Sequence, residues 1–188
     1  MSKLIVISGP SGAGKGTIVK ELLNIYKKKK DKVHLSVSAT TRDPREGEKD
    51  GVNYYFISLD DFMEKIKNKE FLEYNQYGTG KYYGTLKNHV LSYLNKGYDV
   101  ILEIDINGYK QIIKNYKDAI GIFVMTKNLK ILEERLRNRG TETEEQIESR
   151  LKTARKELRN RKIYPHIIIN EDGKANEAAE ELYKIIKS

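Results

Sequence analysis

The clearest indication of the fold is the stretch Gly9-Pro10-Ser11-Gly12-Ala13-Gly14-Lys15-Gly16-Thr17. It follows the apolar run Leu4-Ile5-Val6-Ile7, which predicts a buried strand, and it precedes residues whose apolar positions recur with helical spacing. Glycines let several backbone N–H groups converge on an anion, and a helix N-terminus adds a favourable dipole. The spacing GxxxxGK between a strand and a helix therefore predicts a polyphosphate-binding loop, in preference to a glycine turn that binds nothing.

The lysine of this loop and the residues after it bear on phosphate and metal binding. Lys15 is expected to reach the β and γ phosphates and to follow charge as it develops there. The next position, usually Ser or Thr, is Gly16, so the hydroxyl that would bind Mg²⁺ is missing and Thr17 comes one residue later. Glu103 and Asp105 end an apolar strand, where carboxylates of a parallel sheet point toward the ligand crevice. We expect Mg²⁺ near Thr17, Glu103 and Asp105, held mainly through water, although a solvated strand end would also explain the two carboxylates.

Apolar strands alternate with helical patterns along most of the chain, which predicts an α/β fold with a parallel sheet covered on both faces. Between residues 38 and 88 the pattern changes to short strands, tyrosines and glycines, which indicates an inserted subdomain. The predicted strands are residues 4–7, 34–38, 54–57, 71–74, 99–105, 120–125 and 167–169. The predicted helices begin near residues 17, 60, 90, 109, 129, 144 and 178, and residues 39–53 and 77–85 are predicted to be loops. Asp60 is expected to cap the second of these helices, and Thr143 with Gln146 to form a capping box for the sixth, which runs to about Arg161.

Length and composition limit the possible classes of protein. The 188 residues suit one domain with a substantial core. Charged residues make up 33% and hydrophobic residues 38%, and the longest apolar runs are far shorter than the roughly 18 residues that a membrane helix needs. The first apolar run is also too short for a signal peptide. Because cysteine is absent, disulfides and thiolate chemistry are excluded, and we expect a cytoplasmic protein without a membrane partner.

Further segments, each occurring once along the chain, together indicate membership of a protein family. They are Ser38-Ala39-Thr40-Thr41-Arg42-Asp43-Pro44-Arg45-Glu46-Gly47-Glu48, Gly51-Val52-Asn53-Tyr54-Tyr55-Phe56, Phe71-Leu72-Glu73, Tyr82-Tyr83-Gly84-Thr85, Leu102-Glu103-Ile104-Asp105 and Arg139-Gly140-Thr141-Glu142-Thr143. With the glycine-rich loop, these segments resemble the guanylate kinase family over essentially the whole chain, and TTRxPRxGE is the most specific of them. The resemblance implies a P-loop three-layer α/β sandwich with a parallel sheet core, an inserted nucleoside-monophosphate-binding subdomain and a mobile lid. The implied boundaries are 1–37, 89–126 and 157–188 for the core, 38–88 for the GMP-binding subdomain and 127–156 for the lid.

The resemblance also implies an activity. The enzyme would transfer the γ-phosphoryl group of ATP to GMP, and we expect dGMP to serve as well, giving ADP and GDP in purine nucleotide metabolism with Mg²⁺ as the cofactor. In-line transfer needs no covalent enzyme intermediate. No general base is needed either, because the accepting phosphate is already ionised. Catalysis would then consist of alignment and electrostatic stabilisation.

The ATP side of the site is expected to combine the glycine-rich loop with arginines of the lid. Arg135 and Arg139 lie four residues apart and so share one face of a predicted helix, and Arg150 follows on the next helix. Arginines that arrive with lid closure supply positive charge and exclude water. By resemblance, ATP is bound by Gly9, Pro10, Ser11, Gly12, Ala13, Gly14, Lys15, Gly16, Thr17 and Asn170. The residues assigned to catalysis are Lys15, Arg42, Arg135, Arg139 and Arg150.

The GMP phosphate is expected to bind within the inserted subdomain. Arg42 and Arg45 lie three residues apart on a polar loop and can converge on one phosphate, whose geometry an arginine fork matches. Tyr54 and Tyr83 can donate hydrogen bonds to it without adding charge. Two arginines on a loop would alone indicate ordinary surface, but their place in the TTRxPRxGE segment favours binding. By resemblance, all four residues bind the α-phosphate.

Guanine presents N1–H and a 2-amino group side by side, and one carboxylate can accept from both. Glu73 matches the family residue that does so, and Ser38, Thr85 and Asp105 match its other base contacts. Adenine lacks the amino group and carries an acceptor at N1, so a site of this kind can reject it by roughly 10⁴-fold. The segment from Tyr77 to Lys81 is one residue longer than the family pattern.

Other functions remain open at this point. A kinase for AMP or a pyrimidine nucleotide would share Lys15 but would not need a carboxylate at the acceptor base. A non-catalytic guanylate-kinase-like module would bind protein ligands, although such modules usually have eroded phosphate loops. The net charge of +8 would also suit nucleic acid, yet the basic residues follow the expected nucleotide sites and not one long stripe, so we expect no nucleic-acid partner. The sequence leaves the oligomeric state open, and His34, His89 and His166 look scattered, with structural or surface roles.

Overall fold

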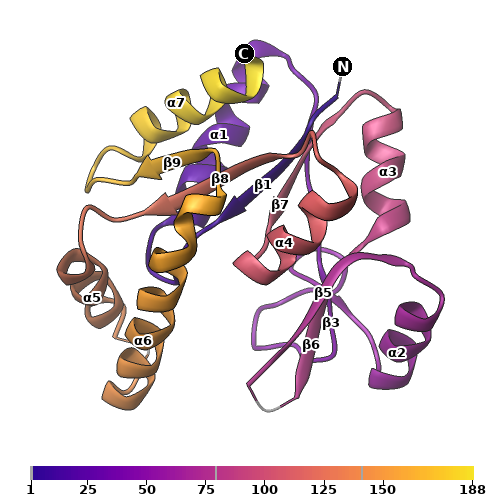
Figure 1. Ribbon diagram of the computed structural model, residues 1–188, viewed down its shortest axis with the longest axis horizontal. Helices are drawn as coiled ribbons and strands as arrows, with labels where there is room; N and C mark the ends of the chain where they lie inside the picture. Colours follow the sequence, from indigo (N-terminus) through magenta and orange to yellow (C-terminus); the bar gives the residue numbers. More distant parts are fainter. Residues whose placement is uncertain (1, 79, 141) are drawn as a thin grey trace. The chain divides into compact units, whose positions relative to one another are not determined.

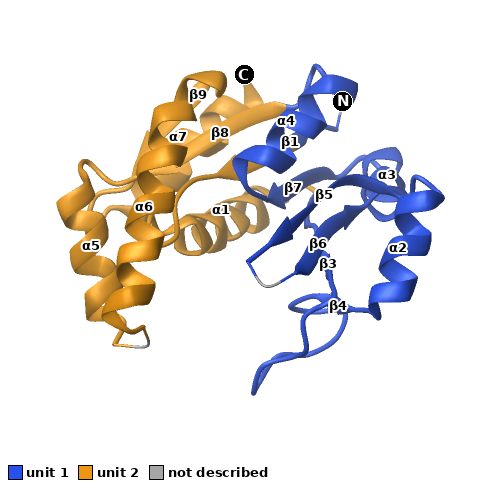
Figure 2. Cartoon of the chain, turned by 60° about the horizontal axis from the view of Figure 1, so that its bottom comes forward, with its two compact units in different colours: residues 1–4, 33–119 blue, residues 5–32, 120–188 orange. Residues whose placement is uncertain are grey.

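The computed structural model describes residues 2–78, 80–140 and 142–188, and the chain forms two compact units. Unit 1 consists of Met1–Leu4 and Val33–Ala119, and unit 2 of Ile5–Lys32 and Ile120–Ser188 (Figure 2). Thr79 of the predicted loop 77–85 and Thr141 of the segment 139–143 lie outside the described residues. The predicted boundaries between core, GMP-binding subdomain and lid stay a prediction.

Unit 2 is built on parallel strands. Strands β1 (Leu4–Ser8), β8 (Ile120–Met125) and β9 (His166–Ile169) pair in parallel in the order β1-β8-β9, with Ile7 opposite Ile122. All five residues of β1 are buried, as expected for an apolar strand in a parallel sheet covered on both faces. The helices of the unit are α1 (Lys15–Lys29), α5 (Leu129–Asn138), α6 (Glu144–Asn160) and α7 (Ala175–Lys187), with a 3₁₀ turn at Arg161–Ile163 (Figure 1).

The helices of unit 2 form where the sequence pattern predicts them. Ile18, Leu22 and Tyr26 of α1 are completely buried, and α1 packs against α7. Tyr26 meets the ring of Tyr183 edge-on, with the centroids 5.2 Å apart. The predicted capping box of α6 is confirmed, because the Thr143 hydroxyl accepts from the Gln146 amide and the Gln146 side chain accepts from the Thr143 amide.

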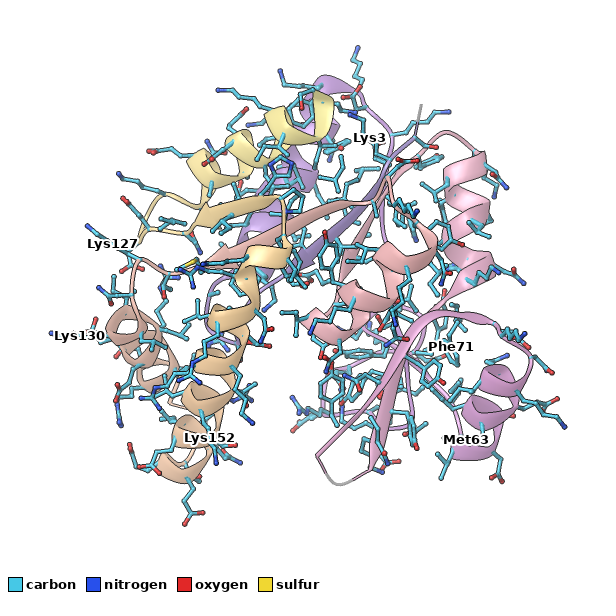
Figure 3. The ribbon with its side chains drawn as sticks, in the orientation of Figure 1. Lys3, Met63, Phe71, Lys127, Lys130 and Lys152 are labelled. Carbon is cyan, nitrogen blue, oxygen red and sulfur yellow. The ribbon has the colours of Figure 1, made fainter. Side chains whose placement is uncertain are left out.

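Unit 1 contains a parallel strand pair and a second sheet. Strand β2 (Val33–Leu35) pairs in parallel with β7 (Asp99–Glu103). The second sheet has the order β4-β3-β6-β5 and consists of β3 (Ala39–Thr40), β4 (Tyr55–Phe56), β5 (Phe71–Tyr77) and β6 (Lys81–Leu86). The helices are α2 (Leu59–Lys67), α3 (Lys87–Asn95) and α4 (Ile106–Asn115). Helix α2 buries Phe62, whose ring stacks on Phe71 at 4.4 Å, and leaves Met63 partly exposed (Figure 3).

The structure corrects the predicted loop 77–85, most of which is strand β6. This strand pairs antiparallel with β5, placing Thr85 opposite Glu73 and Gly84 opposite Tyr74. The tyrosines and glycine of this stretch suggested a loop, but a Cβ on Gly84 would lie 2.8 Å from the Phe71 ring. The glycine is therefore there for close packing inside a sheet and does not mark a turn.

The structure also corrects the predicted ends of several strands and helices. The predicted strand 34–38 ends at Leu35, and the predicted loop 39–53 begins with the two-residue strand β3. The cap of α2 is not Asp60 but Ser58, whose hydroxyl accepts from the Asp61 amide at 3.0 Å. Serine is a strong N-cap, and Asp60 instead lies in the first turn, where its charge suits the helix dipole.

Two of the histidines are not scattered. In unit 1, His34 stacks on Tyr93 with the ring centroids 3.5 Å apart and lies 5.7 Å from the ring of His89. The Tyr55 hydroxyl lies 3.3 Å from Nε2 of His89. Burial, together with the nearby His89, lowers the pKa of His34, so a neutral ring that packs like its aromatic neighbours is favoured. The predicted structural role for these two residues agrees with this aromatic cluster.

A helix long and apolar enough to cross a bilayer is not found among residues 2–78, 80–140 and 142–188.

Candidate functional site

The glycine-rich loop of unit 2 connects β1 to α1 and depends on glycine at two close approaches. Gly9 has φ 144°, and a Cβ there would lie 2.0 Å from the carbonyl oxygen of Val124. Gly14 has φ 85°, and a Cβ there would lie 2.2 Å from Nδ2 of Asn170. Both glycines are therefore required by the backbone conformation as well as by the space available.

Helix α1 begins at Lys15, two residues earlier than predicted from the apolar pattern, so Lys15, Gly16 and Thr17 form its first turn. Gly14 occupies the N-cap position without a side-chain cap, and no acidic residue lies in the first turn. The N–H groups at this end of the helix and the positive end of its dipole thus favour an anion. The Lys15 ammonium group donates to the carbonyl oxygens of Gly9 at 2.5 Å and Pro10 at 3.1 Å, which holds it over the loop.

Arg135 and Asn170 meet at the loop. Arg135 of α5 donates to the carbonyl oxygens of Ala13 at 3.3 Å and Asn170 at 2.9 Å, and to the Asp172 carboxylate at 2.6 Å. The buried side chain of Asn170, directly after β9, donates to the same Ala13 oxygen at 2.8 Å. The structure therefore brings together three of the residues assigned to the ATP side from widely separated positions in the sequence.

A cavity of about 390 Å³ opens beside this contact in unit 2. Arg139 and Thr17 line it together with Arg135 and Asn170. The remaining lining residues are Gly12, Gly14, Asn138, Glu171, Asp172, Gly173 and Ala175. The lining thus combines the start of α1, where a helix N-terminus favours an anion, with two arginines and the two acidic residues Glu171 and Asp172.

The third arginine assigned to the lid contacts the loop directly. Arg150 of α6 donates to the Ser11 hydroxyl at 2.7 Å, and its Nε lies 2.8 Å from the Glu142 carboxylate. Other basic residues of α5 and α6 are different, because Lys130 and Lys152 are exposed (Figure 3). The three predicted arginines therefore differ from the solvated cations around them in lying at the loop or at the cavity.

In unit 1, the residues assigned to the acceptor phosphate gather around Arg42. Its NH2 group donates to both oxygens of Glu48 at 2.9 Å, and its guanidinium carbon lies 5.5 Å from the centre of the Tyr54 ring. Although burial alone would lower it, hydrogen bonds to Glu48 and Tyr83 raise the pKa of Arg42. Arg45 is more exposed, and its backbone N–H donates to Glu48 at 2.8 Å. Tyr54 and Tyr83 thus lie at the Arg42 guanidinium group, while Arg45 contacts Glu48 through its backbone N–H.

Three of the residues assigned to the base, Glu73, Thr85 and Asp105, lie on β5, on β6 and at the start of α4. Glu73 is only 5% exposed, and the fully buried Thr85 donates to its Oε1 at 2.6 Å. Burial raises the pKa of Glu73 to about 7, and the nearby Asp105 adds to this rise while the Thr85 hydrogen bond opposes it. A carboxyl group of this kind is costly to ionise unless a ligand supplies donors to it.

Asp105 caps helix α4 and does not lie in the predicted strand 99–105, and Ser38 makes a backbone hydrogen bond. Strand β7 ends at Glu103, and Asp105 is the N-cap of α4, accepting from the Gly108 amide at 2.8 Å. Its other oxygen accepts from the Asn75 side chain at 3.2 Å. Ser38 is half-buried, and its carbonyl accepts from the Tyr55 amide.

The comparisons with known proteins agree with this geometry. A family model described as "Guanylate kinase" matches residues 1–188. The chain belongs to the guanylate kinase family. A guanylate kinase from Clostridioides difficile is 50% identical over 185 residues, covering 98% of this chain and 87% of that protein. One from Clostridium tetani is 48% identical over 185 residues, covering 98% and 85%.

A solved structure gives the same fold. The crystal structure of guanylate kinase from Anaplasma phagocytophilum has a TM-score of 0.77 and 28% sequence identity, covering 99% of this chain and 85% of that one. The predicted α/β architecture with a parallel sheet core is therefore confirmed. The resemblance of the separate segments to the guanylate kinase family is confirmed as well.

Some residues that lie at these sites were not predicted from the sequence. Glu48 is the last residue of the TTRxPRxGE segment, and its spacing of six from Arg42 gave no indication of a pair. Asp172 lies 37 residues from Arg135, and Gln111 lies 37 residues from Tyr74. Only the position of Glu48 within a specific motif could have indicated a role. The other contacts depend on how the chain folds back on itself.

The donor groups of the chain suit Mg²⁺ only together with further ligands. Within the described residues, no group of three or more His, Asp or Glu side chains could hold a metal ion. Thr17, which carries a hydroxyl, does line the cavity of unit 2. Mg²⁺ is commonly held by one or two protein groups together with substrate phosphates and water, so these residues fit an ion that arrives with a nucleotide.

Proposed function

We propose that this chain transfers the γ-phosphoryl group of ATP to GMP, giving ADP and GDP, and that it accepts dGMP as well. The proposal rests on membership of the guanylate kinase family and on two anion-binding groups of residues, one in each unit. Unit 2 carries the glycine-rich loop with Lys15, Arg135, Arg139 and Arg150. Unit 1 carries the residues around Arg42 and Glu73.

The observation that carries the proposal is the buried carboxyl group of Glu73. A carboxylate at 5% exposure is unfavourable without donors, and Thr85 supplies its hydroxyl, to Oε1, and its backbone N–H, which leaves other lone pairs of the carboxylate for a ligand. Guanine offers two adjacent donors, N1–H and the 2-amino group, that match the two oxygens of a carboxylate. Ser38 and Asp105 are proposed as further contacts of the base. Adenine would place an acceptor against Glu73, which accounts for selection of GMP over AMP.

The acceptor phosphate is proposed to bind at Arg42, Arg45, Tyr54 and Tyr83. The fork of Arg42 is already held in place by a carboxylate, and a phosphate offers oxygens of similar geometry. The tyrosine hydroxyls can donate to the same phosphate without adding further charge. Orienting the GMP phosphate aligns one of its oxygens for attack on the γ-phosphorus of ATP.

On the donor side, the loop residues 9–17 are proposed to hold the ATP phosphates through backbone N–H groups, with Asn170 near the nucleoside. In the transfer, an oxygen of the GMP phosphate forms a bond to the γ-phosphorus while the bond to the β-phosphate oxygen of ADP breaks. Lys15, Arg135, Arg139 and Arg150 stabilise the charge that moves between these oxygens. Thr17, Glu103 and Asp105 are proposed as contacts, mainly through water, of a Mg²⁺ ion that would neutralise charge on the nucleotide phosphates when bound.

The organisation of the domain is proposed to follow the family. Residues 38–88 would form the GMP-binding subdomain and residues 127–156 the lid, with the core made of 1–37, 89–126 and 157–188. Lid arginines that approach the phosphates on closure would exclude water and so prevent hydrolysis of ATP. Because its substrates are nucleotides and the chain lacks cysteine, we propose that it acts in the cytoplasm, with ATP and GMP as its partners.

The test is an assay of four acceptors, GMP, AMP, UMP and CMP, each with ATP and Mg²⁺. We expect GMP to be preferred over AMP by roughly 10⁴-fold in kcat/KM. Use of AMP at a rate comparable to that of GMP would contradict the proposal. Lys15→Met should abolish turnover, and Lys20→Met, an exposed lysine of the same helix, is the matched control. Retained turnover in Lys15→Met would instead remove the loop from the reaction.

A further inference from the structure

Helix α4 packs against strand β5, which carries Glu73 (Figure 1). Gly108 is buried in the first turn of α4, and a Cβ on it would lie 2.6 Å from Oε2 of Glu73 and 3.1 Å from its Cδ. The backbone of Gly108 does not require glycine, because its φ is not in the left-handed region. Glycine also weakens a helix relative to alanine. The absence of a side chain at Gly108 therefore makes room for the Glu73 carboxylate.

One turn later, Gln111 of the same helix binds the backbone beside Glu73. Its side-chain carbonyl accepts from the Tyr74 amide at 3.2 Å, and its side-chain amide donates to the Tyr74 carbonyl at 2.8 Å. Strand β5 is the last strand in the order β4-β3-β6-β5, so these two Tyr74 groups face away from β6. Gln111 takes the place of a further strand and fixes the backbone immediately after Glu73.

The cap of α4 makes a third connection to the same strand. Asp105 accepts from the Gly108 amide at 2.8 Å through one oxygen and from the Asn75 side chain at 3.2 Å through the other. The start of α4 is thereby tied to β5 at Tyr74 and Asn75, the two residues that directly follow Glu73. Thr85 approaches Oε1 of Glu73 from β6, while Gly108 leaves room for Oε2 against α4.

We propose that Gly108 and Gln111 are positioning residues of the base site. Gly108 allows the Glu73 carboxylate to lie against the first turn of α4, and Gln111 fixes the strand that carries it. Together they set the direction of the two carboxylate oxygens, and through it the preference for a base with N1–H and a 2-amino group. This inference rests on the proposed function, because it takes GMP as the acceptor.

The test compares GMP with IMP, a nucleotide that lacks only the 2-amino group, in three variants of the full chain. Gly108→Ala should lower the ratio of kcat/KM for GMP to that for IMP by about tenfold, because the methyl group displaces Oε2. Gln111→Ala should lower the ratio by a smaller factor of about threefold. Lys110→Ala, an exposed residue of the same helix, should leave the ratio unchanged.

A variant that acts only through protein stability would not change the ratio of kcat/KM for GMP to that for IMP. Repeating the comparison in a Glu73→Gln variant makes the test stricter. In Glu73→Gln, the base contact is already lost, so adding Gly108→Ala or Gln111→Ala should lower the ratio no further. The inference is overturned if Gly108→Ala and Gln111→Ala keep the wild-type ratio, or if their effects persist in the Glu73→Gln background. If Gly108→Ala does not fold, Gln111→Ala alone and in that background decides in the same way.

A binding measurement separates this inference from the proposed function. Calorimetric titration of GMP and IMP without ATP gives the same selectivity ratio from dissociation constants. If the wild type fails to phosphorylate GMP, the proposed function is contradicted. Equal binding of GMP and IMP by the wild type would overturn the positioning role as well.

Discussion

The Thr85 hydroxyl donates a 2.6 Å hydrogen bond to Oε1 of Glu73, and both side chains are buried between β5, β6 and α4. The two residues are opposite one another in the antiparallel pairing of β5 and β6. Burial, with a contribution from the nearby Asp105, raises the pKa of Glu73 from its ordinary value of 4.5 to about 7, although hydrogen bonds from the Thr85 hydroxyl and backbone N–H act to lower it. Folding therefore opposes ionisation of Glu73.

A raised acidic pKa in the folded state makes the protein less stable as the pH increases. The stability associated with protonated Glu73 is fully present below about pH 4.5 and is lost as the pH rises through about 7. Glu73→Gln cannot ionise, so it should be more stable than the wild type by up to about 3 kcal/mol at pH 8 and by little at pH 4.5. Urea unfolding at both pH values measures this, with exposed Glu64→Gln as the control. A Glu73→Gln variant no more stable than the wild type at pH 8 would contradict it.

Binding of GMP should have the opposite pH dependence. Only ionised Glu73 accepts from both N1–H and the 2-amino group, so with a pKa of about 7 affinity should rise about tenfold from pH 6 to pH 8. Ionisation of the GMP phosphate, whose second pKa is about 6, contributes to the same rise. Glu73→Gln keeps only this phosphate contribution. Calorimetry at pH 6, 7 and 8 on both proteins separates the two, and identical slopes would rule out Glu73 as the titrating group.

Local sequence patterns were sufficient to predict much of this fold. The buried strand β1, the loop from Gly9 to Gly14 and the helix after it depend on residues close together in the chain, so periodicity and glycine spacing identify them. The capping box of Thr143 and Gln146 is equally local. An apolar run also located β8. A parallel strand that is covered on both faces is apolar along its length, so it can be recognised without knowing which strands it pairs with.

Contacts distant in sequence were not predictable in this way. Strand β6 looked like a loop, because the reason for Gly84 is the Phe71 ring of the neighbouring strand, which leaves no space for a Cβ there. Asp105 was expected in a strand, but it caps α4, and nothing in the local sequence distinguishes the two. The contact of Gly108 with Glu73 spans 35 residues and involves a missing side chain, which leaves no sequence pattern at all.

Arg42→Lys tests whether the arginine fork is what binds the acceptor phosphate. Lysine keeps the charge and can still pair with Glu48, but it cannot make two parallel hydrogen bonds to a phosphate. We expect the KM for GMP to rise by about tenfold or more while the KM for ATP stays within about twofold. Steady-state kinetics with each substrate varied in turn gives both values. Arg155→Lys, an exposed arginine of α6, is the control, and a parallel rise of both KM values would contradict a role confined to GMP.

Arg135 and Asp172 form an ion pair, and we expect the two residues to contribute very unequally to kcat. Asp172 is 77% exposed and Arg135 only 20%, and Arg135 also donates to the carbonyl oxygens of Ala13 and Asn170. Asp172→Ala should therefore leave Arg135 in place and change kcat by less than about threefold. Arg135→Ala should lower kcat by about 100-fold, since it removes a donor to the developing charge. Equal losses in the two variants would show that the ion pair itself, and not the guanidinium group, is required.

Thr143→Ala tests how much the capping box of α6 contributes to stability. The variant leaves the Gln146 amide without its side-chain acceptor, so the free energy of unfolding should fall by about 1 kcal/mol. For a chain of this length that corresponds to a decrease in Tm of about 2–4 °C. Thr153→Ala lies in the interior of the same helix, where the Thr153 hydroxyl only donates back to the Ser149 carbonyl, and alanine is the better helix former there. Calorimetric Tm values should thus fall for Thr143→Ala and stay level or rise for Thr153→Ala; equal decreases would mean that the cap is not what stabilises the start of α6.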